Sequence, residues 1–247
     1  YLTGIFSGSS KLRELDLSSF DVSNVTAFSM FGSNTGLKTL NLSGWNFASV
    51  TSLSGFFSGL TGLESINFTN VNTSNIQYMS GMFSGCSSLK SLDLTSFDTR
   101  NVLDMQSMFA GCVTLKTITV SDDFVVYQVT GSGGMFSGDI ALVGGWGTKY
   151  DPEHIDKEYA HYDYSDIDPG YFNAGDVEYF TVTFNPNGGE VEETSRRVVN
   201  NTRIKELPVP TRTGYVFKGW YTGVTDGVKI SERTTIFEDM TVYAHWF

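Results

Sequence analysis

The sequence predicts an α/β solenoid, in which each repeat of 25–27 residues contributes one short strand and one short helix, followed by a small domain built mainly of strands. Three observations predict this fold class. Leucine and phenylalanine recur at a fixed period through the first part of the chain. Each period carries a helical stripe and then a strand-like run. Residues 179–247 alternate as strands without that period.

The period is visible in two residue types. Equivalent leucines are separated by 25, 26, 26 and 26 residues, at Leu12, Leu37, Leu63, Leu89 and Leu115. Equivalent phenylalanines keep nearly the same spacing, at Phe6, Phe31, Phe57, Phe83, Phe109 and Phe136. A unit of this size is too small for a core of its own, so we expect the repeats to stack around one continuous core.

The helix and the strand are best seen in "NVLDMQSMFAGCVTLKTITV", residues 101–120. Four apolar side chains follow the i, i+3, i+6, i+7 spacing of a short helix: Val102, Met105, Met108 and Phe109. The apolar spacing then shortens toward that of a strand, at Leu115, Ile118 and Val120. Asn24, Asn75 and Asn101 precede the helical stripe in three repeats, where asparagine is a good N-cap, so we expect a structural role for them.

The strands, such as "LRELDL" and "LKSLDL", are expected to turn leucines inward and polar residues outward. Stacking would align the outward residues in columns. We regard two of these columns as candidate ligand-binding residues on the strand face: Asp16, Asn41, Asn67 and Asp93; and Arg13, Lys38, Glu64, Lys90 and Lys116. The alternative is that they are only the hydrated side chains of a sheet, since the face lacks the Tyr, Trp and Arg anchors typical of binding hot spots.

Cys86 and Cys112 lie 26 residues apart, at the same position of adjacent repeats. Adjacent strands are about 4.8 Å apart, a separation that a disulfide tolerates. The preferred interpretation is nevertheless two buried structural thiols in the stack, with Leu60 at the equivalent position one repeat earlier.

Charge is concentrated between the two predicted domains. Residues 151–180 hold 1 basic and 9 acidic residues of a chain whose net charge is −11. No basic stripe suits a nucleic acid, and no apolar run approaches the roughly 20 residues of a membrane-spanning helix. Nucleophile-elbow, zinc-protease and phosphate-loop motifs are absent from the sequence, so we expect no enzyme and no catalytic residues.

The acidic segment "YDPEHIDKEYAHYDYSDIDPGYF", residues 150–172, is read as a cap over the open end of the solenoid, with tyrosines inward and acids in solvent. Two alternatives remain for its carboxylates. They could bind calcium, with Asp163, Asp166 and Asp168 as weak candidates, or a pair could act as acid and base. We therefore expect no cofactor, with calcium as the alternative.

Two family resemblances follow from these motifs. The frame in "VNTSNIQYMSGMFSGCSSLKSLDL" and "FDTRNVLDMQSMFAGCVTLKTI" resembles the BspA-like leucine-rich repeats of microbial surface proteins, also described as the Mycoplasma 26-residue surface-protein repeat. The stretch from "YFTVTFNPNGGEVEE" through "GYVFKGWYTG" to "TVYAHWF" resembles the Listeria–Bacteroides repeat, the B repeat of internalin-type proteins. The second resemblance implies a β-grasp-like fold, which is an α+β or β domain.

We therefore expect a leucine-rich-repeat solenoid at residues 1–142, a cap and connector at 143–178, and a B-repeat domain at 179–247. Because the chain opens inside a repeat, we expect a fragment whose export signal and anchor lie outside it. The resemblances imply a bacterial protein, secreted or at the cell surface, that mediates adhesion by binding an extracellular protein or glycan and inserts in no membrane. The alternatives are a structural stalk and a calcium-dependent glycan-binding module.

Overall fold

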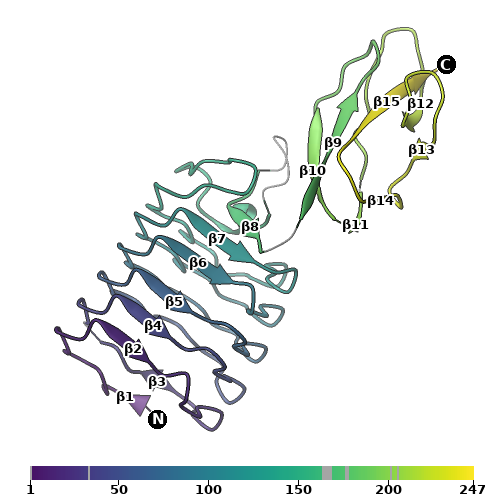
Figure 1. Cartoon of the computed structure of the whole chain (residues 1–247). Coiled ribbons are helices and arrows are strands. Elements are labelled where there is room, and N and C mark those ends of the chain that lie inside the picture. Colours follow the sequence, from purple (N-terminus) through teal and green to yellow (C-terminus); the bar gives the residue numbers. More distant parts are fainter. Residues whose placement is uncertain (1, 33, 163–168, 176–177, 201, 205) are drawn as a thin grey trace. The chain divides into compact units, whose positions relative to one another are not determined.

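The computed structural model describes residues 2–32, 34–162, 169–175, 178–200, 202–204 and 206–247. These form two compact units. The first takes in the described residues up to 162 together with residues 170–175, and the second takes in Pro169 and the described residues from 178 to 247. The first unit is a stack of coils, one for each sequence repeat (Figure 1). The finer division of this unit into repeats and cap stays a prediction.

One side of the coil stack is a ladder of short parallel strands. β2 (Glu14–Asp16), β4 (Thr39–Asn41) and β5 (Ser65–Asn67) form one sheet, and β6 (Ser91–Leu94), β7 (Thr117–Val120) and β8 (Phe172–Ala174) form the next. Equivalent residues of successive repeats are paired, for example Leu15 with Leu40 and Leu40 with Ile66. A two-residue pair, β1 (Leu2–Thr3) with β3 (Phe28–Ser29), lies in the first coils.

The prediction of one helix per repeat is wrong, and the first unit is not an α/β fold. In the described residues the single helical segment is one 3-10 turn, η1 (Lys157–Tyr159), in the cap. Along the expected helix of residues 101–112, alternate N–H groups donate to the next coil rather than within their own turn: Met105 to Gly131, Ser107 to Gly133, Phe109 to Met135 and Gly111 to Ser137. Of the N–H groups between them, those of Met108 and Ala110 donate to the carbonyl three residues earlier in their own coil, and that of Gln106 donates to the Asp104 carboxylate.

Backbone conformation explains why these residues cannot form a helix. An α-helix needs φ near −63° at every residue. In this segment Ser107 has φ 53° and Gly111 has φ 78°, and glycines with φ between 59° and 83° occupy the same two positions in neighbouring repeats: Gly55, Gly81, Gly134, Gly59, Gly85 and Gly138. Two left-handed residues in each repeat break any helix before it completes a turn. The segment is therefore a series of turns that bond coil to coil.

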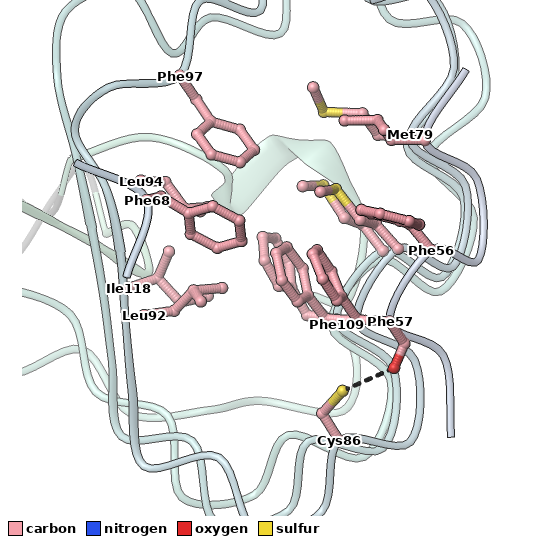
Figure 2. Close-up of a cluster of buried hydrophobic side chains, with 14 of the residues drawn as sticks. Phe56, Phe57, Phe68, Met79, Cys86, Leu92, Leu94, Phe97, Phe109 and Ile118 are labelled. Carbon is pink, nitrogen blue, oxygen red and sulfur yellow. Dashed lines mark hydrogen bonds between the residues drawn. The ribbon is translucent and has the colours of Figure 1, made fainter. Parts of the chain in front are cut away.

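The core runs through the whole coil stack as a column of phenylalanine rings. Neighbouring rings of Phe57, Phe83, Phe109 and Phe136 lie 5.4–5.8 Å apart and within 13° of parallel. Leu92, Ile118 and Phe97 face them from the strand side (Figure 2). Phe97 and Trp45, each just after a strand, are buried in the core, whereas Phe20, after β2, is 49% exposed.

Two of the three asparagines predicted to cap helices, Asn75 and Asn101, join the coils instead. Asn75 Nδ2 donates to the Ala48 carbonyl at 2.5 Å, and Asn101 Nδ2 donates to the Ser74 carbonyl at 2.8 Å. Each carbonyl lies 27 residues earlier, in the preceding coil. Asn24, in an early coil, reaches only the Ser23 hydroxyl of its own coil, at 3.5 Å. The N-cap prediction is wrong, because the described residues that follow these asparagines form no helix.

Tyrosine side chains pack against the last coil of the stack. Tyr171 is fully buried, with its ring 5.1 Å from Phe136 and 4.9 Å from Tyr159. Its hydroxyl accepts the Asp151 N–H at 2.8 Å. After the cap the chain returns to the ladder as β8, which pairs with β7.

The second unit is a mixed five-stranded sheet in the order β10 (Ser195–Val199), β9 (Tyr179–Asn185), β15 (Met240–Trp246), β12 (Phe217–Tyr221), β13 (Lys229–Ile230). Only β9 and β15 pair in parallel, and β11 (Thr202–Arg203) pairs with β14 (Thr235–Ile236). This unit is built of strands as predicted, but its described residues include no helix, so the α+β form of a β-grasp fold is not found.

The core of the second unit contains one buried ion pair. Trp220 lies at its centre, with the indole N–H donating to the Pro208 carbonyl. Arg196 contacts both carboxylate oxygens of Glu193, at 2.7 and 2.5 Å, and the Glu193 residue is 1% exposed. Across the described ranges of both units, no helix has the length and apolar character needed to cross a bilayer.

Candidate functional site

The outer face of strands β2, β4 and β5 carries a shallow depression of about 600 Å³. Nine residues line it, three from each strand: Glu14, Leu15, Asp16, Thr39, Leu40, Asn41, Ser65, Ile66 and Asn67. The strand ladder places equivalent residues of three repeats side by side. Three of the predicted ligand-binding residues, Asp16, Asn41 and Asn67, therefore meet in one hollow.

The predicted Asp/Asn column has a structural task as well as an exposed position. Each of its side chains accepts, through Oδ1, the backbone N–H two residues later, at 2.9–3.1 Å, which forms an Asx turn at the end of the strand. The hydroxyls of Ser18, Thr69 and Thr95 also donate to this oxygen in three of the four turns. These turns fix the side chains of Asp16, Asn41, Asn67 and Asp93 in one orientation.

Hydrogen bonding also keeps Asp16 ionised. The hydroxyl and the backbone N–H of Ser18, with the amide of Asn41, lower the pKa of the Asp16 carboxyl below its usual value. Asp16 therefore carries its negative charge at neutral pH.

The charged column beside the depression is largely self-paired. Lys38 Nζ lies 2.5 Å and Lys90 Nζ 3.2 Å from the two carboxylate oxygens of Glu64, and both lysines lower the pKa of that carboxyl. Arg13 donates to the carbonyls of Ser10 and Gly36. Lys116 is exposed on the coil that carries β7. None of these five residues lines the depression.

The depression itself combines small polar side chains with negative charge. Leu15, Leu40 and Ile66, the middle residues of the three strands, also line it, but they pack against the core of the coil stack. Among the nine lining residues the only charged groups are the carboxylates of Glu14 and Asp16, both on β2, and none is aromatic. This arrangement suits binding rather than covalent chemistry, because it holds carboxylates, amides and hydroxyls but no nucleophile paired with a base.

A second column lies inside the coil stack, and only its members Leu60, Cys86 and Cys112 were predicted from the sequence. It begins with Asn34 and continues through Leu60, Cys86, Cys112 and Asp139 at steps of 26 or 27 residues. The Asn34 amide and the thiols of Cys86 and Cys112 each donate to the carbonyl of a phenylalanine in the preceding coil. Figure 2 shows the bond from Cys86 to the Phe57 carbonyl. Both cysteines are free and buried.

Burial sets the protonation of this column. It raises the pKa of the Cys86 thiol to about 12, and it raises that of Cys112 as well, with a contribution from the nearby Asp139 carboxylate. Asp139 is fully buried, its Oδ1 accepts the Cys112 N–H at 2.9 Å, and its Oδ2 lacks any hydrogen-bond partner in the described structure. Burial raises the pKa of the Asp139 carboxyl to about 8.

The acidic segment of the cap contains structural carboxylates. Asp151 accepts the Glu153 N–H, and Asp156 accepts the Gly134 N–H at 2.7 Å. The calcium candidates Asp163, Asp166 and Asp168 lie outside the described residues. Where the structure does describe the chain, no three His, Cys, Asp or Glu side chains are grouped as a metal site requires.

Comparison with known proteins yields two families and one relative. The model described as "Mycoplasma protein of unknown function, DUF285" matches residues 1–71 and 27–146, and that of the Listeria–Bacteroides repeat domain matches residues 180–245. Internalin H of Listeria monocytogenes serovar 1/2a is 39% identical over 72 residues, which are 28% of this chain and 13% of that protein. The similarity therefore spans a small part of the length of internalin H.

The first match covers more than half of the chain and coincides with the coil stack, and the second coincides with the five-stranded unit. The chain therefore belongs to the DUF285 family, the BspA-like repeats of surface proteins, and carries a Listeria–Bacteroides repeat domain after them.

Proposed function

We propose that this chain is a non-enzymatic recognition module of a bacterial surface protein, and that the outer face of β2, β4 and β5 binds an extracellular protein or glycan. The observation that carries the proposal is the depression of about 600 Å³, which gathers Asp16, Asn41 and Asn67 from three successive coils. A hollow on a repeat surface is a usual place for a solenoid-like protein to bind a partner.

The depression is pre-organised. Its Asp and Asn side chains are fixed by Asx turns, and its strands are held in register by the ladder beneath them. Side chains that are already ordered lose little conformational entropy when a partner binds, so more of the contact energy is retained as affinity. The small Thr39 and Ser65, exposed on the same face, leave room for that partner.

A location at the cell surface or outside the cell fits the two repeat families and the similarity to internalin H. Adhesion is the activity we propose for such a module. The competing function is a stalk that displays a binding site located elsewhere in a longer protein.

The test is a binding screen of the whole chain against arrays of extracellular-matrix proteins and of glycans. A Thr39→Lys/Ser65→Lys variant fills the depression with long charged side chains. A Thr51→Lys/Ser58→Lys variant is the matched control, because it adds the same charge at exposed hydroxyl positions of one coil that do not line the depression. Circular dichroism confirms that both variants remain folded.

We expect at least one array component to bind the wild-type chain and the Thr51/Ser58 control, and to bind the Thr39/Ser65 variant at least tenfold more weakly. Absence of binding to either array would contradict the proposal and favour a stalk. Binding that survives in the Thr39/Ser65 variant would place recognition elsewhere, and if such binding also disappeared with a calcium chelator, the segment that holds Asp163, Asp166 and Asp168 would be the first place to look.

A further inference from the structure

We propose that the outer face of the five-stranded sheet in the second unit binds an acidic polysaccharide, one whose sugar units carry carboxylates. This surface belongs to the second unit, so it does not depend on the function proposed for the depression on the first. Three features of the sheet support it: a row of aromatic and polar side chains, a lysine held beside one of the rings, and strands without acidic residues.

The sheet has a core face and an outer face. Alternate residues of the five strands, among them Val182, Trp220 and Val242, are buried in the core of the second unit. Successive side chains of a strand point to opposite faces, so the residues between them lie on the outer face. There Tyr221 and Tyr243 are partly exposed to solvent.

Cross-strand pairing aligns four outward residues in one row. Asn185 of β9 pairs with Tyr243 of β15, and Tyr243 pairs with Tyr221 of β12. Tyr221 in turn pairs with Lys229 of β13. The row crosses three strand spacings of about 4.8 Å, or about 14 Å in all. An extended oligosaccharide can therefore follow it from the amide of Asn185 to the ammonium group of Lys229.

The aromatic part of the row suits a sugar. The face of an aromatic ring is negative, and the C–H groups of a sugar ring stack against it. The Tyr221 ring is held by His245, whose ring lies within 12° of parallel at a centroid distance of 4.0 Å. His245 Nε2 donates to the Gly223 carbonyl at 2.8 Å. The ring of Tyr221 is therefore ordered before a partner arrives, which lowers the entropic cost of binding.

Lys229 gives the row a positive end. Its stem lies across Gly219, since a Cβ at this glycine would be 2.7 Å from Lys229 Cε and 3.5 Å from Cε2 of Tyr221. A side chain at Gly219 would thus displace the lysine from its place beside the ring. Glycine within a strand weakens it and often marks a close approach of this kind. A sugar stacked on Tyr221 would have its carboxylate next to the Lys229 ammonium group.

The five strands contain no Asp or Glu, in a chain whose net charge is −11. At the margin of the face, Asp239 accepts the Thr181 N–H at 2.6 Å. Asp226 lies in the loop between β12 and β13, and within the described residues Lys229 forms no ion pair with either carboxylate. An acidic polymer on these strands therefore meets a cation and no competing carboxylate.

One variant removes the rings. Tyr221→Thr/Tyr243→Thr keeps residues of high β-propensity on the strands, and threonine is already present on this face at Thr183. The matched control is Tyr215→Thr/Phe237→Thr, which removes two exposed rings outside the five strands. Circular dichroism checks the fold, and Tyr221→Thr alone replaces the double variant if that does not fold.

A second variant reverses the charge. Lys229→Glu alters an exposed side chain of the row. Arg203→Glu is the matched control, because it makes the same charge change at an exposed position of β11, outside the five-stranded sheet.

The probes are fluorescently labelled hexasaccharides of hyaluronan, which alternates glucuronate with N-acetylglucosamine, and of chitin, which has no carboxylate. They are titrated with the whole chain at physiological salt and followed by fluorescence anisotropy. We expect hyaluronan to bind wild type and both controls equally, and the tyrosine variant at least about tenfold more weakly. Lys229→Glu should weaken it by about fivefold, the effect of one exposed ion pair, and chitin should bind wild type more weakly by a similar factor.

Several outcomes would overturn the inference. These are no binding of hyaluronan, equal loss in either control, and binding that the tyrosine variant retains, which would show general attraction to cations. Equal binding of chitin would make the partner a neutral glycan. An acidic peptide, (Glu-Thr)5, that binds as tightly as hyaluronan and is lost in the tyrosine variant would make it a protein segment.

The Thr39→Lys/Ser65→Lys variant separates this inference from the proposed function. We expect it to bind hyaluronan as wild type does. Hyaluronan lost in this variant, but retained in the tyrosine variant, would place the sugar on the depression, so the inference would fail while the proposed function stands.

Discussion

Replacing Asp139 with asparagine should stabilise the coil stack, and the gain should grow as the pH rises. The carboxyl of Asp139 has a pKa of about 8 in the folded protein and an ordinary value of 3.8 once unfolded. Between these values the folded state holds a proton that the unfolded state has released. Stability contributed by this proton is full below about pH 4, falls as the pH rises, and is lost above about pH 8.

The slope follows from linkage. One proton bound only by the folded state changes the free energy of unfolding by about 1.4 kcal/mol for each pH unit. From pH 4.5 to pH 7.5 the wild-type chain should therefore lose about 4 kcal/mol that the Asp139→Asn variant keeps. Asparagine preserves the Oδ1 acceptor for the Cys112 N–H and adds an N–H donor where Oδ2 has no partner.

The assay is urea unfolding followed by circular dichroism at half-unit pH steps from 4.5 to 7.5, for wild type, Asp139→Asn and Asp93→Asn. The Asp93 variant is the control, because it also removes a carboxylate but keeps an exposed Asx turn. Subtracting the wild-type free energy of unfolding from that of each variant at the same pH cancels the contribution of all other titrating groups. A difference for Asp139→Asn that stays constant across this range, or that matches the Asp93 control, would refute the reasoning.

Three further predictions concern backbone strain, the buried ion pair and the thiols. Ser107→Gly should raise the free energy of unfolding by about 1 kcal/mol, because φ is 53° at this position and left-handed backbone costs other residues about that much; unchanged stability in urea would contradict it. Glu193→Gln should destabilise the second unit by about 3 kcal/mol, because it removes the charge partner of Arg196, and the loss should appear as an earlier fluorescence transition in urea. Changing both Glu193 and Arg196 to methionine should recover most of that loss. Cys86 and Cys112 should react with a thiol reagent only after unfolding, and this reaction should need no added reductant because both thiols are free. Fast labelling of the native chain would disprove their burial.

The strands could be predicted from the sequence, whereas the local form of the apolar stripe could not. Spacing of i, i+3, i+6 is compatible with a helix, but successive turns of three residues also place side chains on one side at that interval. The bond from Met108 to the Met105 carbonyl is such a turn. The signal that distinguishes the two was present in the glycines, since Gly55 and Gly59 recur as Gly81 and Gly85 and hold a left-handed backbone.

The candidate site was predictable in position but not in detail. Alternation along the strands placed Asp16, Asn41 and Asn67 on one face, and the depression lies there. The pattern of Asp or Asn followed two residues later by Ser or Thr also marks an Asx turn, which explains why these side chains have less freedom than a column of free ligands would have. The depression lies over β2, β4 and β5 because side-chain packing differs from coil to coil. A repeat pattern predicts the same packing in every coil, so it could not show this difference.

Asp139 was hidden by a different physical feature, the lengthening of the last repeat. Equivalent residues are 26 apart from Asn34 to Cys112, but the next step is 27, so a strict period misses Asp139. In the stacked coils, the side chains of Asn34, Cys86 and Cys112 in this column each donate a hydrogen bond, whereas Leu60 has no group that could. A carboxylate cannot donate but a carboxylic acid can, so the neutral form of Asp139 continues the chemistry of the column and the ionised form interrupts it. Because this position lies in the coil next to the tyrosine cap, its ionisation should loosen the capped end of the stack before the strands that form the depression.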